Sequence, residues 1–288
     1  FADWRASAHP PGPAPWPEEI GRFSFDGIAE GTVANAVNEA EPGRIFDDVA
    51  VVPGRVGQAL RLSGENNVSF ALGGKWTRDD AFSLSLWIKP PTAFDRAVVF
   101  HRSKAWTDAA SNGYELLIED GRLSAALVHF WPGNALRVVA RDPLPVNEWT
   151  HVVWSYDGSS RAAGLKLFVN GRLAAVDVVR DALTKDINRG GEDRLTIGQR
   201  FRDRGFKGGE VDELRLFARA VSPVEAAVLA GRDVPAPAAE AAAWFEHFLL
   251  AVDPPHRENL SALRALRQAR SAAGDSLPEI MTMRELPQ

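Results

Sequence analysis

Short segments that alternate apolar and polar residues, and that end at Gly, Pro or Asn-Gly, recur along most of this chain and strongly limit its fold. The clearest of them are residues 22–27, 82–90, 149–158, 165–172 and 209–217. Alternation with a period of two places apolar side chains on one face of an extended strand, and the turn residues then end the strand. The pattern predicts an antiparallel β-sandwich.

Shorter segments of the same kind lie between these strands, so that about a dozen strands are expected between Arg22 and Phe217. They are residues 59–62, 68–70, 97–101, 114–119, 123–130, 138–140 and 195–198. Asp120-Gly121 and Asn170-Gly171 predict tight hairpin turns, because Asn, Asp and Gly tolerate the positive φ angles that two-residue turns require. These turns set the register of two strand pairs.

Composition excludes several classes of function. The chain has 288 residues, of which 45% are hydrophobic and 25% charged, with a formal net charge of −5. This is ordinary globular composition, and it lacks the excess of Lys and Arg that nucleic-acid binding requires. The absence of cysteine rules out disulfides, thiolate metal sites, cysteine nucleophiles and haem attachment through Cys-x-x-Cys-His. No stretch reaches the ~18 consecutive apolar residues of a membrane helix.

Both ends of the strand region are marked in the sequence. Residues 1–21 hold prolines at positions 10, 11, 13, 15 and 17, and they are expected to form an extended lead-in to a β domain spanning residues 22–231. After the last strand, Ser222-Pro223-Val224-Glu225 predicts a short helix in which Ser222 is the cap and Glu225 completes a capping box. Gly231 ends this helix.

Residues 232–288 are predicted to form a linker and a helical C-terminal extension. A Pro/Ala-rich linker over residues 232–238 precedes two helical segments, residues 239–252 and 258–273, which Asp253-Pro254-Pro255 separates. Apolar residues at three-residue spacing in the second segment indicate an amphipathic helix. A helical hairpin is therefore expected after the sandwich.

The ordered strand segments resemble the laminin-G-like, concanavalin A-like jelly-roll family. The segments that carry the resemblance are residues 25–27, 57–62, 85–90, 149–152, 156–158, 167–171, 195–198 and 206–217. The resemblance implies an all-β fold, a two-sheet antiparallel jelly-roll sandwich, followed here by the C-terminal α-helical hairpin. It also implies an extracytoplasmic location, either periplasmic or secreted to the cell surface.

The C-terminal stretch ending in residues 277–285 resembles the segment that leads into an uncharacterised domain of large planctomycete-type surface proteins. In those proteins a cytochrome-like module and two domains of unknown function flank an inserted laminin-G-like module. The resemblance implies that this chain is the inserted module, that flanking domains of the same polypeptide are its partners, and that any haem is bound elsewhere. The first residue, Phe rather than Met, fits an excised or processed piece.

Catalysis is the first functional alternative, since the same jelly roll also hosts glucanases. Those enzymes use a Glu-x-Asp-x-Glu strand, which puts all three carboxylates on one face, and this motif is absent. The nearest approximations are Glu115 with Glu119, and Glu210 with Asp212 and Glu213. We interpret them as surface or turn carboxylates, so no catalytic residue is predicted. A Gly-x-Ser-x-Gly nucleophile elbow is also missing.

A calcium site is the second possibility. Asp26 closes the first strand and Asp212 lies on the last, and the terminal strands of a jelly roll commonly pair. Two carboxylates with backbone carbonyls would form a hard oxygen site suited to Ca²⁺, and the family resemblance supports a structural calcium near the rim. The alternative, left open, is that Asp26 stabilises its Asp-Gly turn and Asp212 pairs with an arginine.

Ligand contacts are expected in loops. Trp106 and Trp131 lie in apparent loops and are candidates for stacking on sugars, whereas Trp87, Trp149 and Trp154 occupy strand positions typical of a core. The cationic residues Arg200, Arg202 and Arg204 could bind a sulfated or uronic glycan. The alternatives are that the loop tryptophans fold back on the sandwich and that the arginines form a solvated loop.

Three functional hypotheses follow from the sequence. The leading one is a non-catalytic module that recognises carbohydrate or a surface glycoprotein through Trp106, Trp131, Arg200, Arg202 and Arg204. The alternatives are a glycoside hydrolase on the same fold and a structural spacer that binds no ligand. No nucleic-acid partner and no membrane span are expected.

Overall fold

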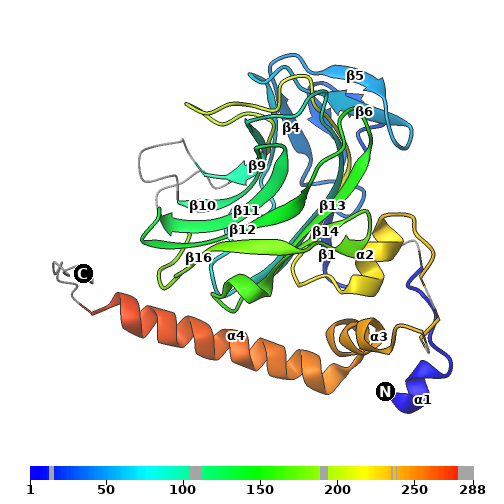
Figure 1. The fold of residues 1–288 in the computed structure, drawn as a ribbon, viewed down its shortest axis with the longest axis vertical. Helices are drawn as coiled ribbons and strands as arrows, with labels where there is room; N and C mark the ends of the chain where they lie inside the picture. Colours follow the sequence, from blue (N-terminus) through cyan, green and yellow to red (C-terminus); the bar gives the residue numbers. More distant parts are fainter. Residues whose placement is uncertain (13–15, 104–111, 189–193, 235, 238, 278–288) are drawn as a thin grey trace.

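The computed structural model describes residues 1–12, 16–103, 112–188, 194–234, 236–237 and 239–277. Two antiparallel sheets face each other and form the predicted sandwich (Figure 1). Sheet A contains, in spatial order, β15 (Arg172–Leu173), β14 (Leu165–Val169), β13 (Thr150–Asp157), β8 (Ala81–Lys89), β18 (Glu210–Phe217), β6 (Gln58–Arg61) and β5 (Ala50–Pro53), with β1 (Glu19–Phe23) also paired to β18. The predicted pairing of the first and last strands is confirmed.

Sheet B is the larger sheet. Its order is β16 (Val176–Asp181), β12 (Asn134–Pro143), β11 (Arg122–Phe130), β10 (Gly113–Glu119), β9 (Arg96–Arg102), β17 (Leu195–Ile197), β7 (Asn67–Phe70), β4 (Gly43–Phe46), β3 (Thr32–Val33) and β2 (Ile28–Ala29). Strands adjacent in sequence from β9 to β12 are also adjacent in space, because tight turns join β10 to β11 and β11 to β12.

Alternating side chains from both sheets fill the space between them. Trp154 of β13 is fully buried, with its ring centroid 5.0 Å from Phe82 of β8 and 5.7 Å from Tyr114 of β10. These three rings join the two sheets at the centre of the core. Burial of aromatic side chains of this size contributes a large share of the hydrophobic stabilisation.

Trp154 therefore occupies the core position predicted for it, but the prediction was wrong for Trp87 and Trp149. In β8 the side chains of Leu86 and Ile88 point into the core, so Trp87 between them points outward. Its ring lies 5.0 Å from the His151 ring and 4.8 Å from the Arg55 guanidinium. Trp149 precedes β13 and remains partly exposed.

Both hairpin turns predicted from the sequence are present. Asp120 and Gly121 have φ angles of 48° and 71°, and Asn170 and Gly171 have 48° and 73°. The flanking residues pair as expected for two-residue turns, Glu119 with Arg122 and Val169 with Arg172.

The short helix α2 (Pro223–Leu229) begins at the capping box predicted from the sequence. The Ser222 hydroxyl accepts the Glu225 N–H at 3.2 Å, and the Glu225 carboxylate accepts the Ser222 N–H at 2.9 Å. Ala226 of this helix packs on the outer face of sheet A against Phe168 and Phe217. The helix therefore covers part of the sheet that would otherwise expose apolar side chains.

The lead-in and the C-terminal segment meet beside α2. Trp16 is buried against Phe217, and β1 begins at Glu19, three residues before the start of the β domain expected at residue 22. The first residues form α1 (Ala2–Arg5), whose Trp4 ring lies 5.9 Å from Trp244 of α3 (Ala241–His247).

A π-helical segment, η2 (Phe248–Val252), joins α3 to α4 (Pro254–Asp275), which runs along the sandwich (Figure 1). The expected start of the second helix at residue 258 was wrong by about one turn, because the Asp253 carboxylate caps the helix by accepting the His256 N–H and Pro254 takes its first position. No residue of α4 is buried. Among the described residues, no helix is both long and apolar enough to span a bilayer.

Substitution of Gly171 tests how closely α2 packs on the β14–β15 turn. A Cβ on Gly171 would lie 2.7 Å from the Cα of Ala227 in α2, whereas Gly31 has a similar φ of +71° and nothing within 4 Å of such a Cβ. We expect Gly31→Ala to cost about 1 kcal/mol, from left-handed backbone strain alone. Gly171→Ala is expected to cost about 2–3 kcal/mol, because a collision with backbone adds to that strain.

Urea unfolding of the two variants and the parent measures these costs. Equal losses for Gly31→Ala and Gly171→Ala would show that α2 moves away freely and that its packing on the turn is loose.

Candidate functional site

The outer face of sheet B carries a closed ring of alternating charges. In β10 the side chains of Tyr114, Leu116 and Ile118 point into the core, so Glu115 and Glu119 point to the opposite face. Neighbouring strands and one loop add three arginines and an aspartate to the same face. The ring consists of Arg96, Glu115, Glu119, Arg137, Arg200 and Asp203.

Each member of this charge ring contacts two members of opposite sign. Arg200 bridges Glu115 at 2.5 Å and Asp203 at 2.6 Å. The remaining N–O distances are 2.7 Å for Arg96–Asp203, 2.7 Å for Arg96–Glu119, 3.3 Å for Arg137–Glu119 and 2.7 Å for Arg137–Glu115. With three guanidinium groups and three carboxylates, the charge ring is electrically neutral.

The loop after β17 supplies Arg200 and Asp203 because it folds back over β9. The Val98 N–H donates to the Arg204 carbonyl at 2.9 Å, and Val98 forms an isolated parallel bridge with Gly205. Glycine is required at 205, since a Cβ there would lie 2.0 Å from the Gly64 carbonyl oxygen. The loop is thereby anchored at its far end while Arg200 and Asp203 enter the charge ring.

Burial and opposite charges act against each other on the ring carboxylates. Burial alone would raise the pKa of Glu115, but the nearby guanidinium groups of Arg200 and Arg137 outweigh it and lower the pKa below its ordinary value. Asp203 behaves in the same way: burial raises its pKa, and hydrogen bonds and charge from Arg96 and Arg200 lower it by more. Both carboxylates are therefore ionised at neutral pH.

His101 borders the charge ring and is neutral at neutral pH. Its ring nitrogens lie 2.9 Å from the Ser103 hydroxyl and 2.9 Å from the Gln199 carbonyl oxygen, and the residue is buried. Burial, with a further contribution from the charge of Arg200, lowers the pKa of His101 to about 4. A charged imidazolium at this position would compete with the guanidinium groups for the same carboxylates.

Trp131, one of the predicted ligand-binding residues, lies on this face beside the charge ring. Its ring packs on Ala126, Val128 and Ala135, and the Arg137 guanidinium lies 4.3 Å from the ring centroid. Trp131 is thus folded back onto the sheet, as the structural alternative expected, and remains partly exposed. The side chain of Phe130, directly before it, is 54% exposed.

The predicted arginines separate into two kinds. Arg200 is fully buried in the charge ring, so the interpretation of residues 200–207 as a solvated loop was wrong for this residue, because Glu115 and Asp203 neutralise it. Arg202 and Arg204 are exposed, and Arg202 lies 5.4 Å from the ring of Phe201, which is itself 61% exposed. Trp106 falls in residues 104–111, outside the described residues.

The structure thus places Trp131 and Arg200 on one face, connected through Arg137 and Glu115. We define the aromatic border as Phe130, Trp131 and Phe201: Trp131 contacts Arg137 of the charge ring, Phe130 directly precedes Trp131, and Phe201 directly follows Arg200 in the chain. Sequence reasoning missed the ring itself. Strand alternation could have placed Glu115 and Glu119 on one face, but the pairing of Arg96 and Asp203 joins residues 107 positions apart.

The interpretation of the candidate catalytic carboxylates as surface or turn groups was wrong for Glu115, Glu210 and Asp212, which are buried within strands and engaged in other contacts. Glu115 and Glu119 belong to the charge ring, and Glu210 accepts hydrogen bonds from Arg61 at 2.7 Å and Lys89 at 3.1 Å. A glycosidase general acid needs a raised pKa, and the pKa of Glu115 is lowered. Both carboxylates of β10 on this face are engaged by arginines.

Asp26 and Asp212, the predicted metal ligands, both bond to the turn between β5 and β6. Asp26 accepts the Gln58 N–H at 2.7 Å, and Asp212 accepts the Val56 N–H at 3.0 Å. Burial raises the pKa of Asp212, and the negative charge of Asp26 adds to this effect against the opposing backbone hydrogen bonds. Among the described residues no arginine side chain pairs with Asp212, which accepts hydrogen bonds from the backbone N–H groups of Val56 and Glu213.

The surroundings of Asp26 and Asp212 are close-fitting. A Cβ on Gly57 would lie 2.0 Å from the Asp26 Oδ1, and one on Gly54 would lie 2.6 Å from the Asp212 Oδ2. Glu213 follows Asp212 in a β-bulge at φ +49°, and burial together with the Asp212 charge raises its pKa. Within the described part of the chain, no group of three or more His, Asp or Glu side chains is arranged to hold a metal.

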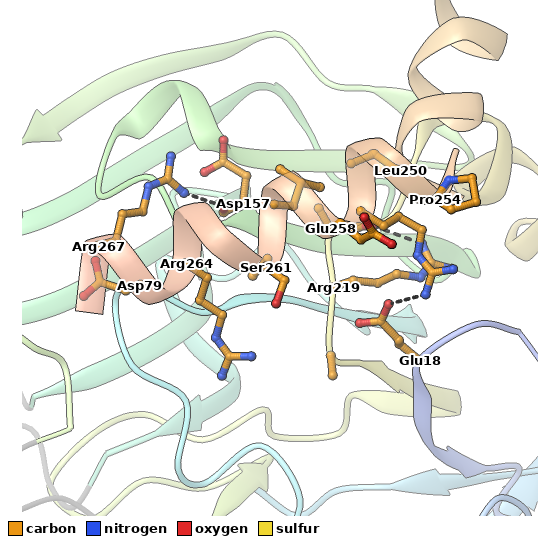
Figure 2. Close-up of a pocket in the computed structure, with 15 residues that line it drawn as sticks. Glu18, Asp79, Asp157, Arg219, Leu250, Pro254, Glu258, Ser261, Arg264 and Arg267 are labelled. Carbon is orange, nitrogen blue, oxygen red and sulfur yellow. Dashed lines mark hydrogen bonds and ion pairs between the residues drawn. The ribbon is translucent and has the colours of Figure 1, made fainter. Parts of the chain in front are cut away.

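A cavity of about 490 Å³ lies elsewhere, between α4 and the sandwich (Figure 2). Its charged lining is largely paired within the protein: Arg264 with Asp80 at 2.5 Å and Arg257 with Glu18 at 3.2 Å. None of the predicted ligand-binding residues lines it. Because no α4 residue is buried, the cavity lies at a loosely packed interface between the helix and the sandwich.

Comparison with known proteins identifies the fold. A family model described as the concanavalin A-like lectin/glucanases superfamily matches residues 62–227. Domain 4 of AbnA, a GH43 extracellular arabinanase from Geobacillus stearothermophilus, was solved in complex with arabinotriose. It superposes with a TM-score of 0.51 and 21% identity, over 74% of this chain and 98% of that domain. No curated protein matches the sequence.

Two toxin structures are also similar. The binding domain of Paraclostridial Mosquitocidal Protein 1 gives a TM-score of 0.57 at 12% identity, over 74% of this chain and 52% of that one. The binding domain of botulinum neurotoxin serotype G gives 0.57 at 13% identity, over 74% and 50%. The chain spans about half the length of these two toxin domains. At such identities the likeness shows the fold alone.

His101 makes the stability of the protein sensitive to acid. The imidazole has a pKa of about 4 when folded and an ordinary value of 6.5, so between these pH values the unfolded chain binds a proton that the folded one does not. This contribution is absent above pH 6.5 and destabilises increasingly as pH falls to about 4, reaching about 3 kcal/mol.

Denaturant unfolding at several pH values measures the effect. We expect the stability difference between the parent and His101→Asn to change by about 3 kcal/mol from pH 7 to pH 4, in favour of the variant. His9→Asn, at an exposed position, is the control. A pH-independent difference would show that His101 does not remain neutral in the folded protein.

Proposed function

The chain belongs to the concanavalin A-like lectin/glucanases superfamily, and we propose that it is a non-catalytic module that recognises carbohydrate, free or carried by a glycoprotein. The observation that carries the proposal is Trp131, which packs on the outer face of sheet B and contacts Arg137 of the neutral charge ring, with the exposed Phe130 directly before it. Exposed aromatic side chains grouped near polar ones are characteristic of interaction surfaces rather than of ordinary solvated strands.

The aromatic border has the chemical character that a sugar requires. A pyranose or furanose ring presents C–H groups on its faces and hydroxyls around its edge. Aromatic rings bury the C–H faces, and fixed polar groups bind the hydroxyls. Here Arg137 holds the Trp131 ring in place at 4.3 Å, so little side-chain entropy is lost on binding. The exposed Arg202 and Arg204 favour a ligand with carboxylate or sulfate groups.

The charge ring also supports binding rather than catalysis. Arginines engage both Glu115 and Glu119, and the lowered pKa of Glu115 keeps its carboxylate ionised, which is unsuited to a general acid. Among the similar structures, one is an arabinanase domain in complex with arabinotriose and others are toxin binding domains. These similarities favour a binding module, placed outside the cytoplasm beside flanking domains of the same polypeptide.

We further propose that Ca²⁺ binds where Asp26 and Asp212 meet the β5–β6 turn. The donor chemistry fits, since two carboxylates and neighbouring carbonyl groups are hard oxygen ligands. Asp26 accepts a backbone hydrogen bond from Gln58, and Asp212 accepts two, from Val56 and Glu213; each carboxylate oxygen has two lone pairs and so retains acceptor capacity. A cation here would relieve the charge repulsion that contributes to the raised pKa of Asp212.

Carbohydrate binding is tested on a glycan array with the parent protein, followed by calorimetry on any ligand found. We expect Trp131→Ala to weaken binding at least tenfold, because the ring would no longer cover the sugar face; tenfold corresponds to about 1.4 kcal/mol. Arg202→Ala with Arg204→Ala should weaken only anionic ligands. Phe245→Ala removes an exposed aromatic of α3 and should leave binding unchanged.

Other outcomes of the same experiment decide between the alternatives. Release of reducing ends from laminarin, xylan or agarose would establish a glycoside hydrolase and overturn the non-catalytic proposal. No ligand on the array, together with no hydrolysis, would favour a structural spacer.

Calcium binding is tested by thermal melts in EGTA and in added Ca²⁺. We expect Ca²⁺ to raise the Tm of the parent by several degrees, since a ligand at ~100 times its Kd adds about 2.7 kcal/mol of stability. Asp212→Asn should abolish this shift, while Glu65→Gln, an exposed acid in the β6–β7 turn, should retain it. Identical melts in EGTA and Ca²⁺ would leave Asp26 and Asp212 as turn-stabilising groups only.

A further inference from the structure

Strand β16 forms the outer edge of sheet B and pairs on one side only. Within the described residues its sole strand partner is β12 (Figure 1). The central Val178 and Val179 are 57% and 50% exposed. Leu173 of β15, the edge of sheet A, is also exposed, and only residues 174–175 separate the two strands. An apolar, unpaired edge of this kind is a template for another strand.

The two opposite charges on β16 share one face because the strand contains a bulge. In the register with β12, Asp177 lies opposite Val139 and Arg180 lies opposite Arg137, with an irregularity between them. Val139 and Arg137 are two residues apart and therefore on the same face. Without the extra residue, positions 177 and 180 would lie on opposite faces.

Among the described residues Arg180 forms no ion pair. Its neighbour across the sheet, Arg137, has the same charge and is already engaged by Glu115 and Glu119. In the described part of the chain no carboxylate lies within 4.0 Å of Arg180. Directly opposed like charges on a sheet are unfavourable, so an external carboxylate beside Arg180 would be stabilising.

Asp177 is only weakly engaged. Its single ion pair among the described residues is with Arg141 at 2.8 Å, and the two side chains are 56% and 62% exposed. Pairs at this exposure contribute at most about 1 kcal/mol. Asp177 is therefore available to a second partner.

We propose that β16 pairs in antiparallel fashion with β16 of a second copy of this chain, about a two-fold axis between Val178 and Val179. In this register each Asp177 lies opposite the Arg180 of the other copy, and the central valines pair with each other. A two-fold interface must be complementary to itself, and the order Asp177-Val178-Val179-Arg180 satisfies this requirement in the antiparallel direction. Charged residues on an edge strand normally prevent it from pairing with other strands. Here their order makes pairing with an identical strand favourable, because opposite charges face each other.

The surroundings limit the pairing to the middle of the strand. The Ala162 N–H, in the short helix η1 (Ala162–Gly164), donates to the Asp181 Oδ1 at 3.0 Å. The end of β16 is thereby occupied, and residues 176–180 form the available edge. Antiparallel pairing would join the two copies of sheet B into one sheet, with both outer faces on the same side. Two copies of the aromatic border would then act together on a multivalent surface.

Sedimentation equilibrium of the whole chain tests the dimer through charge reversal. Asp177→Arg and Arg180→Asp should each weaken self-association at least tenfold, because each places like charges opposite each other. The double variant Asp177→Arg/Arg180→Asp should restore the parent affinity. An equimolar mixture of the two single variants should form heterodimers, since both cross-strand pairs are then of opposite sign.

Controls separate this result from misfolding. All four positions from Asp177 to Arg180 are exposed, so the thermal melts of the single variants should match the parent. Glu65→Arg, an equal change of charge in the β6–β7 turn, should leave self-association unchanged. A parent protein that is monomeric at about 100 μM, or single variants that dimerise as well as the parent, would overturn the proposal. Neither result bears on carbohydrate binding by the monomer.

Discussion

Charge neutralisation on the outer face of sheet B is the requirement on which the rest of the functional surface depends. Three guanidinium groups and three carboxylates lie on a sheet face that is largely removed from water, and an unpaired buried charge costs several kcal/mol. The closed ring gives every member two partners of opposite sign. The ring also holds the loop after β17 against β9. If this loop moved away, Glu115 would lose its ion pair with Arg200, and Arg96 would lose its ion pair with Asp203.

The same neutralisation supports the proposed non-catalytic role of a fold that is shared with glucanases. A hydrolase needs a carboxyl group that remains protonated near neutral pH, and this requires burial without compensating cations. Around Glu115 the compensating cations outweigh burial. Arg137 serves two surfaces at once, since it neutralises Glu115 and also covers one side of Trp131. The aromatic border is consequently supported by a rigid base, which favours recognition with little reorganisation.

The edges and faces of the sandwich differ in how far their apolar side chains are covered. At the β15 and β16 edges apolar side chains remain exposed, whereas α2 covers the outer face of sheet A with a well-capped and packed helix. Helix α4 contributes less to this covering. Its contacts with the sandwich are polar, such as Arg264 with Asp80 and Ser271 with Asp79, and none of its residues is buried. Contacts of this kind position a helix without adding much stability.

The sequence by itself determined the features that depend on neighbouring residues. Strand periodicity, the Asp120-Gly121 and Asn170-Gly171 turns and the Ser222 capping box all act within a few residues, and the structure confirms each of them. The order of the strand segments was sufficient to identify the jelly roll. Strands with weak local signals were not predicted. These are β4, β5 and β16, which are short or exposed and lack the alternation of buried strands.

Only the tertiary structure decided what surrounds each side chain. Arg200 and Arg202 are alike in sequence, yet one is buried between Glu115 and Asp203 and the other is exposed. Alternation could place Trp87 on one face of β8, but which face meets the core depends on Leu86 and Ile88 being buried by the opposite sheet. Charge compensation, unlike a turn or a cap, is a long-range property, since it joins residues that only the completed sandwich brings together.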